Sequence, residues 1–267
     1  MERWKRMVGQ GALTGMVLEI ILSVGFPVGL SIYLYMKKKL TWKAFGIGIF
    51  IFILFARVLE KLLHTAMVDA DGTSLKWTES PWAFVLYGGL AAGIFEEIGR
   101  YIGMKWFLKD KQGYWDGLSY GVGHGGIEAI LVGGFAGLNA ILFAHLINAG
   151  TLADVVGSQV TPEKLAEIKE HFLSQGFAVY FMGGIERIVA VILQLVYSLI
   201  VLLSIRRHAV KFLFLAIGLH AVIDFIPALY QTGLISSIWV TEAIILAIGI
   251  VAAYALFKSP KWFPVHE

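Results

Sequence analysis

The chain has 267 residues, of which 58% are hydrophobic and 15% are charged, and its mean hydropathy is +0.74. Soluble domains carry roughly 25% charged residues, so this composition favours a multi-span membrane protein. The absence of cysteine excludes disulfides and thiolate metal ligands. The net charge of +3 comes without a long basic run, so no nucleic-acid partner is expected.

Seven apolar stretches follow one another along the chain, and each is long enough to cross a bilayer. We predict that each is helical, because a backbone exposed to lipid must satisfy its own hydrogen bonds. The expected fold is all-α, a polytopic integral membrane helix bundle of about seven spans, within a range of six to eight. It forms a single transmembrane domain over residues 1–267. The predicted spans are 11–35, 44–66, 82–107, 117–149, 175–205, 211–230 and 235–257.

The fourth stretch is too long for a simple span, and its middle contains Gly133, Gly134 and Gly137. We therefore expect a helix, a glycine-rich break, and then a short helix or re-entrant piece. The loop that follows, about residues 151–171, is the most hydrophilic part of the chain. There the Thr161-Pro162 pair predicts the start of a short amphipathic helix.

Charges in the loops predict the orientation in the cell membrane, because positively charged loops tend to stay in the cytoplasm. Basic residues cluster after the first, third and fifth spans and in the tail, whereas the loops after the second and sixth spans are acidic or nearly uncharged. This alternation predicts an outside N-terminus and a cytoplasmic C-terminus, although the N-terminal Arg3, Lys5 and Arg6 disagree with it. The basic clusters are Lys37–Lys39 with Lys43, Lys105 with Lys109 and Lys111, Arg206 with Arg207 and Lys211, and Lys258 with Lys261.

Ionisable residues on three predicted helices reach a similar depth in the membrane. Glu96 and Glu97 lie about a dozen residues from the inner loop, as does His124 on the next helix, while His220 and Asp224 lie about ten and thirteen residues from theirs. At 1.5 Å per residue, each is roughly 15–20 Å along its helix. Because such residues are costly within a membrane, their convergence predicts a functional site.

Two of these helices carry a histidine and an acid at i and i+4, where they share one face. The pairs are His124 with Glu128, and His220 with Asp224. Each pair can offer two metal ligands, or a histidine oriented by its own acid. Imidazole and carboxylate without thiolate suit zinc or another borderline divalent metal.

Such a set of groups supports hydrolysis, since a metal, or a glutamate with a histidine, can activate water. Arg100 lies one turn from Glu96 and three residues from Glu97, and it can keep one of them ionised or hold it in place. Taken alone, these three residues fit a structural ion pair as well as they fit catalysis. The combined set also allows a path for cations or protons in a transporter.

Three short segments, "EEIGR", "YGVGH" and "HAVID", occur in this order on separate predicted helices. They resemble the motifs of the CAAX-protease and bacteriocin-processing superfamily of membrane proteases. With "GVGHGGIEA" and "GGIERIVA", the chain is most similar to the YhfC family of intramembrane metalloproteases over nearly its whole length.

The resemblance implies roles for individual residues. Glu96 or Glu97 would be the general base on the attacking water, with Glu96 the first choice, His124 would be the second-motif histidine, and His220 with Asp224 the third-motif pair. Two residues separate the glutamates from Arg100 in this chain, whereas three separate them in the CAAX-type pattern. In this respect the chain is more similar to the PrsW-type proteases. Aspartate in place of asparagine at the end of the third motif favours metal ligation, and Glu128 has no counterpart in the CAAX-type pattern.

The function expected from the sequence is that of an intramembrane metalloprotease, which hydrolyses peptide bonds of peptide or membrane-protein substrates in or near the membrane. The expected cofactor is Zn²⁺, held by His124, His220 and Asp224 with Glu128 as a further candidate. The expected catalytic set is Glu96, Glu97, Arg100, His124, His220 and Asp224. A metal-free glutamate mechanism, a cation- or proton-conducting transporter, and a catalytically degenerate binding protein are the alternatives.

Overall fold

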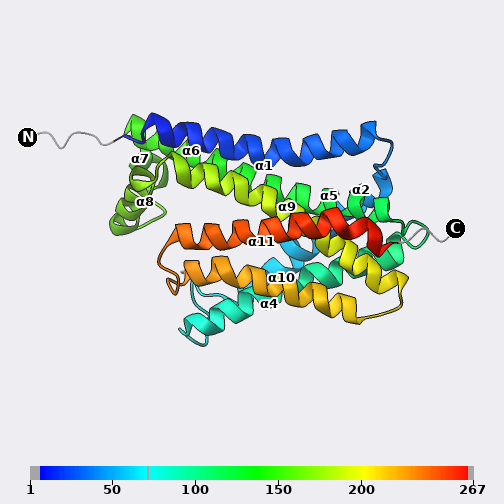
Figure 1. Cartoon of the computed structure of the whole chain (residues 1–267). Helices are drawn as coiled ribbons and strands as arrows, with labels where there is room; N and C mark the ends of the chain where they lie inside the picture. The colour runs from blue at the N-terminus through cyan, green and yellow to red at the C-terminus, as the bar shows by residue number, and fades with distance from the viewer. Residues whose placement is uncertain (1–6, 71, 264–267) are drawn as a thin grey trace, which may run out of the picture. The chain divides into compact units, whose positions relative to one another are not determined.

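The computed structural model describes residues 7–70 and 72–263 (Figure 1). Within these residues the secondary structure is helical, apart from isolated bridges of Leu75 with Val68 and Thr78. The α-helices are α1 (Gln10–Met36), α2 (Trp42–Phe52), α3 (Lys61–Met67), α4 (Pro81–Ile102), α5 (Tyr114–Ala129), α6 (Phe135–Ala149), α7 (Leu152–Val156), α8 (Pro162–Ser174), α9 (Phe177–Arg206), α10 (Lys211–Gln231) and α11 (Ile238–Lys258). Three π-helices, η1 (Ile53–Glu60), η2 (Gly103–Phe107) and η3 (Ile130–Gly134), and a 3₁₀ turn, η4 (Ser259–Trp262), adjoin them.

The prediction of an all-α polytopic membrane protein is confirmed. Among the described residues, five helical stretches are long and apolar enough to cross a membrane: Gln10–Met36, Tyr114–Ala149, Phe177–Arg206, Lys211–Gln231 and Ile238–Trp262. They coincide with five of the seven predicted spans. The other two predictions, 44–66 and 82–107, fall on α2–η1–α3 and α4–η2. These are helical too, but one carries Arg57, Glu60 and Lys61 and the other carries the Glu96-Glu97 pair with Arg100.

The predicted break after Glu128 is wrong. A π-helix, η3, follows α5 directly and leads into α6, so the glycine-rich stretch widens the helical turn without ending the helix. A π-helix keeps the backbone hydrogen-bonded through i to i+5 pairs, which is why the chain does not need to break there. The predicted helix after Thr161 is confirmed as α8, where the Thr161 side chain accepts a hydrogen bond from the Lys164 backbone N–H at 3.3 Å and Pro162 is the first residue.

The chain divides into two compact units, which are described separately. The first comprises residues up to Phe26 and Ala129–Ile188, and it contains the start of α1, α6, α7, α8 and the start of α9. Its core is made of small and medium apolar side chains: Val8, Ala12, Met16, Ala140, Ala144, Ile147, Leu152 and Tyr180. The expectation of a single domain over residues 1–267 stays a prediction.

The second unit comprises Pro27–Glu128 and residues from Val189 onward, and it contains all seven predicted site residues. Helices α4 and α10 lie side by side in it, and α11 packs on α10 (Figure 1). The C-terminal half of α9 is the most deeply buried helix segment among the described residues, with Leu199, Val201 and Leu202 almost fully enclosed. This part of α9 therefore forms the centre of the second unit.

Glycines let α5 lie unusually close to its neighbours α2 and α9. A Cβ on Gly123 would fall 2.1 Å from the carbonyl oxygen of Phe45 on α2, and one on Gly48 would fall 2.2 Å from the carbonyl oxygen of Tyr120. On the other side, a Cβ on Gly125 would meet the Gln194 side chain on α9 at 2.7 Å. Because contact between backbones excludes water, His124 is fully buried between these helices.

The predicted location in a membrane is supported by these apolar helices. The sequence predicts an outside N-terminus and a cytoplasmic C-terminus. Arg3, Lys5 and Arg6 at one end and residues 264–267 at the other lie outside the described residues. The orientation across the membrane stays a prediction.

Candidate functional site

The two adjacent glutamates of α4 point in different directions, because consecutive residues of an α-helix are about 100° apart around its axis. Glu96 turns toward His124 on α5, whereas Glu97 turns toward Arg100 on its own helix and His220 on α10. Glu97 is fully buried and Glu96 is 7% exposed. The pair therefore serves two separate groups of side chains.

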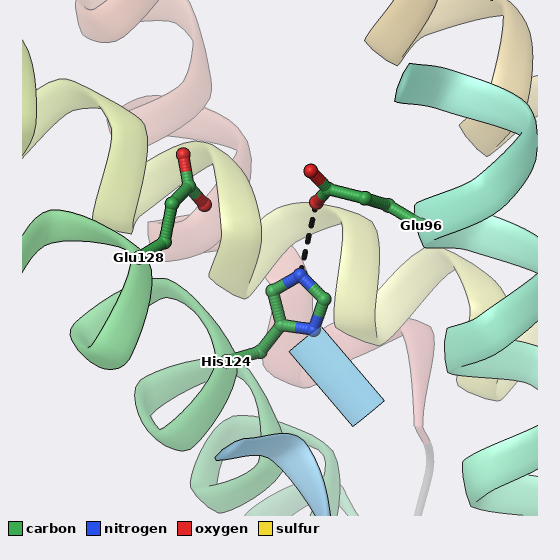
Figure 2. Close-up of side chains that lie close together, drawn as sticks. All are labelled: Glu96, His124 and Glu128. Atoms are coloured by element: carbon green, nitrogen blue, oxygen red, sulfur yellow. Dashed lines mark hydrogen bonds and ion pairs between the residues drawn. The ribbon is translucent and has the colours of Figure 1, made fainter. Parts of the chain in front are cut away.

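The first group consists of Glu96, His124 and Glu128 (Figure 2). His124 Nε2 lies 2.9 Å from Glu96 Oε2. One ligand atom from each of the three residues lies within 4.8 Å of the other two. Figure 2 shows the imidazole and the two carboxylates directed toward one space, with α4 supplying one acid and α5 the other two residues. Two aromatic rings hold the imidazole: Phe52 packs edge-on at 5.1 Å, and Tyr120 stacks at 6.0 Å between centroids.

The second group centres on Glu97. Arg100 donates to both of its oxygens, from Nε at 2.9 Å and from Nη2 at 3.2 Å. His220 Nδ1 lies 2.7 Å from Glu97 Oε1, and His220 Nε2 lies 3.5 Å from Asp224 Oδ2. The His220 ring stacks on Tyr197 with centroids 4.8 Å apart. Glu97 is thus held by a two-pronged ion pair and by an imidazole.

Two polar residues of α9, Gln194 and Ser198, also belong to the site. Gln194 donates from Nε2 to Glu96 Oε2 at 3.1 Å and to Glu128 Oε2 at 2.7 Å, and its Oε1 accepts a bond from Arg100 Nη2. Ser198 Oγ lies 2.5 Å from Arg100 Nη1. The sequence interpretation missed both because it considered ionisable residues. Their i, i+4 spacing in the apolar second half of α9 indicates that they share a face of the helix, but not that this face meets the site.

The structure thus brings all seven predicted residues into two connected groups within one unit. Glu96, His124 and Glu128 form a possible ligand set, and Arg100, His220 and Asp224 gather around or next to Glu97. Whether His220 and Asp224 also bind the metal with His124 stays a prediction.

The first group fits a divalent metal ion chemically. Zinc binds imidazole nitrogen and carboxylate oxygen at about 2.0–2.2 Å in tetrahedral geometry, so its ligand atoms lie about 3.3–3.6 Å apart. The atoms of this set lie within 4.8 Å of one another, so they would have to approach by at most about 1.5 Å to bind it. His124 is fully buried, and its Nε2 is the ring nitrogen directed at Glu96 (Figure 2). Its Nδ1 points away from the two carboxylates and has no hydrogen-bond partner among the described residues, so Nε2 is the atom that a metal ion between the carboxylates would bind.

A separate polar cluster lies on α3, η1 and α4. His64 Nε2 lies 3.2 Å from Glu60 Oε1, and His64 Nδ1 lies 2.7 Å from the Tyr87 hydroxyl. Glu60 is buried at the end of η1, and Trp77 packs edge-on against Tyr87. The cluster satisfies the polar atoms of Glu60 and His64, and we assign it a structural role.

Comparison with known proteins decides the family. The family model described as YhfC intramembrane metalloprotease matches residues 21–245. The chain belongs to the YhfC family. It is also 34% identical over 257 residues to the uncharacterized membrane protein YhfC of Bacillus subtilis (strain 168), an alignment that covers 96% of this chain and all of that protein. No solved structure matches.

Membership of the YhfC family confirms the resemblance drawn from "EEIGR", "YGVGH" and "HAVID". The family description supports a membrane peptidase that uses a metal ion and acts on peptide or membrane-protein substrates. It does not specify zinc, the ligands or the residue that activates water.

Proposed function

We propose that this protein is a zinc-dependent intramembrane endopeptidase whose reaction takes place at the Glu96–His124–Glu128 group. The observation that carries the proposal is the meeting of one buried imidazole, one buried carboxylate and one partly buried carboxylate from two helices. In this proposal His124 and Glu128 hold the ion from one face of α5, and Glu96 approaches from α4. When bound, zinc supplies Lewis acidity, which lowers the pKa of water and polarises the peptide carbonyl.

Glu96 is the proposed general base. Its Oε2 contacts both His124 Nε2 and Gln194 Nε2, so the carboxylate is oriented from two sides. A general base must lie within hydrogen-bond reach of the proton that it takes, and Glu96 borders the space between the proposed ligands.

Glu97 is the weaker candidate for this proton transfer. Its two oxygens already accept three bonds, two from Arg100 and one involving His220. Taking up a proton would break a buried, two-pronged ion pair, which costs several kcal/mol. We therefore assign Glu97 and Arg100 to holding α4 in place, with His220 and Asp224 beside them.

The proposal is tested with purified protein and a peptide that contains a transmembrane segment. We expect the wild-type protein to retain about one zinc ion per chain by elemental analysis, and to cleave the peptide. The variant Glu96→Gln should lose cleavage but keep its folded stability, whereas His124→Ala should lose zinc. The variant His220→Ala decides whether the third-motif histidine is also a ligand, since only a ligand change would remove zinc from a protein that remains folded.

Two results would overturn the proposal: undiminished cleavage by Glu96→Gln, or wild-type protein that neither binds a divalent metal nor cleaves any peptide. Metal flux into liposomes without cleavage would favour the transporter alternative instead. That alternative has lost one of its supports, because the predicted discontinuous helix at Gly133–Gly137 is helical throughout.

A further inference from the structure

The Gln194 side chain connects the two groups of the site. It is 3% exposed and lies on α9, between Arg100 of α4 and Glu128 of α5. Its Nε2 supplies hydrogen bonds to Glu96, the proposed general base, and to Glu128, the proposed metal ligand. One neutral amide thus donates to both carboxylates at the same time.

Arg100 fixes which way this amide points. A guanidinium carries donors and no acceptor, so only the carbonyl oxygen of Gln194 can face it. Arg100 Nη1 also binds the backbone carbonyl of Gln194 at 3.2 Å, and Ser198 Oγ donates to the same carbonyl at 2.7 Å. The amide nitrogen must therefore face the carboxylates, where an inverted amide would bring oxygen against oxygen.

Packing leaves the side chain little freedom to move. A Cβ on Gly125 would meet Gln194 Cβ at 2.7 Å and Cγ at 3.1 Å, so α5 touches the side chain along its stem. Gly125 directly follows His124, which places the contact beside the proposed ligand set. Gln194 is held by packing at its stem and by hydrogen bonds at its head.

We propose that Gln194 is a positioning residue that sets the spacing of Glu96 and Glu128 for a divalent metal ion, with its own polarity locked by Arg100. The inference rests on the proposed function, since it assigns these two acids to the metal site. A carboxylate oxygen has two lone pairs, so it can accept a hydrogen bond and bind a metal ion together. Removing partners of this kind weakens metal binding about 10–100-fold in other metal sites.

The test measures the zinc dissociation constant of the purified full-length protein with two variants of opposite character. Gln194→Met keeps the length of the side chain but removes both donors, and we expect zinc binding about 10–100-fold weaker. Gln194→Glu keeps the acceptor for Arg100 but puts a third carboxylate oxygen next to the other two. It also removes both donors, so the positioning role predicts zinc binding about 10–100-fold weaker here too, whereas the added negative charge alone would strengthen it. A merely space-filling role would leave zinc binding unchanged in Gln194→Met and stronger in Gln194→Glu.

Ser204→Ala is the matched control on the same helix. The Ser204 hydroxyl is buried and donates to the Val201 backbone carbonyl at 2.8 Å, so its removal should leave zinc binding within about threefold of wild type. If Gln194→Met binds zinc within threefold of wild type, the inference is wrong. If Gln194→Met fails to fold, Gln194→Glu decides: weaker binding supports the inference, and unchanged or tighter binding overturns it. Absence of zinc binding by the wild-type protein would instead count against the proposed function.

Discussion

Replacing Arg100 by methionine should destabilise the protein far more than any loss of a surface charge. Arg100 is fully buried and donates to Glu97, Gln194 and Ser198. The substitution leaves the Glu97 carboxylate enclosed without its cation. Breaking a buried ion pair by removing one partner costs about 3–5 kcal/mol, whereas exposed pairs contribute about 0.2–1 kcal/mol.

The assay is reversible unfolding in mixed detergent micelles, which gives the free energy of unfolding for each variant. Lys105→Met is the matched control. This exposed lysine follows Arg100 by five residues, donates to the Tyr101 hydroxyl at 3.0 Å and lies over the Tyr101 ring. We expect its effect to stay within about 0.5 kcal/mol.

A second substitution separates the charge from the packing. Adding Glu97→Gln to Arg100→Met removes the uncompensated charge, so the double variant should recover about 1 kcal/mol or more relative to Arg100→Met. The reasoning is refuted if Arg100→Met costs no more than Lys105→Met. It is also refuted if the two substitutions at positions 97 and 100 destabilise additively, because the pair would then not be coupled.

Three further substitutions test the fold. Gly123→Ala would place a Cβ 2.1 Å from a backbone carbonyl oxygen of α2 and should cost about 2 kcal/mol or more in the same unfolding assay, whereas Gly46→Ala, with open space around it, should be close to neutral. Thr161→Ala removes the cap of α8 and should cost about 1 kcal/mol locally, seen as faster amide hydrogen exchange in the first turn of that helix while α9 is unchanged. Tyr87→Phe removes the hydroxyl that lies 2.7 Å from His64 Nδ1 and should lower the free energy of unfolding by about 1 kcal/mol; an unchanged value would mean that water replaces the bond fully.

The sequence predicts which residues come together better than it predicts which of them contact one another. Depth along the helices and i, i+4 spacing were sufficient to select Glu96, Glu97, His124, Glu128, His220 and Asp224, because both follow from helix geometry alone. The sequence could not decide which glutamate meets which histidine. That pairing depends on the rotation of α4 against α5 and α10, which glycine contacts and side-chain packing determine.

Uncharged polar residues mark the limit of this kind of prediction. Gln194 carries no charge and lies in a helix that is apolar for most of its length, so neither composition nor periodicity distinguishes it from a residue that hydrogen-bonds to its own helix. The π-helices are equally difficult to predict from the sequence. One extra residue in a helical turn barely changes an apolar pattern, which is why the glycines after Glu128 suggested a break instead.

The π-helix η1 lets its segment vary in length in a way that hydrophobicity does not reveal. A π turn holds about one residue more than an α turn. Deleting a single residue within Ile53–Glu60 would therefore let the turn tighten toward an ordinary α-helix, with its backbone bonds intact. Because the wide turn had absorbed the extra residue, the residues beyond the deletion would keep nearly the same direction around the axis, and His64 would stay beside Tyr87. Relatives that are one residue shorter here would keep both the helix and the contact.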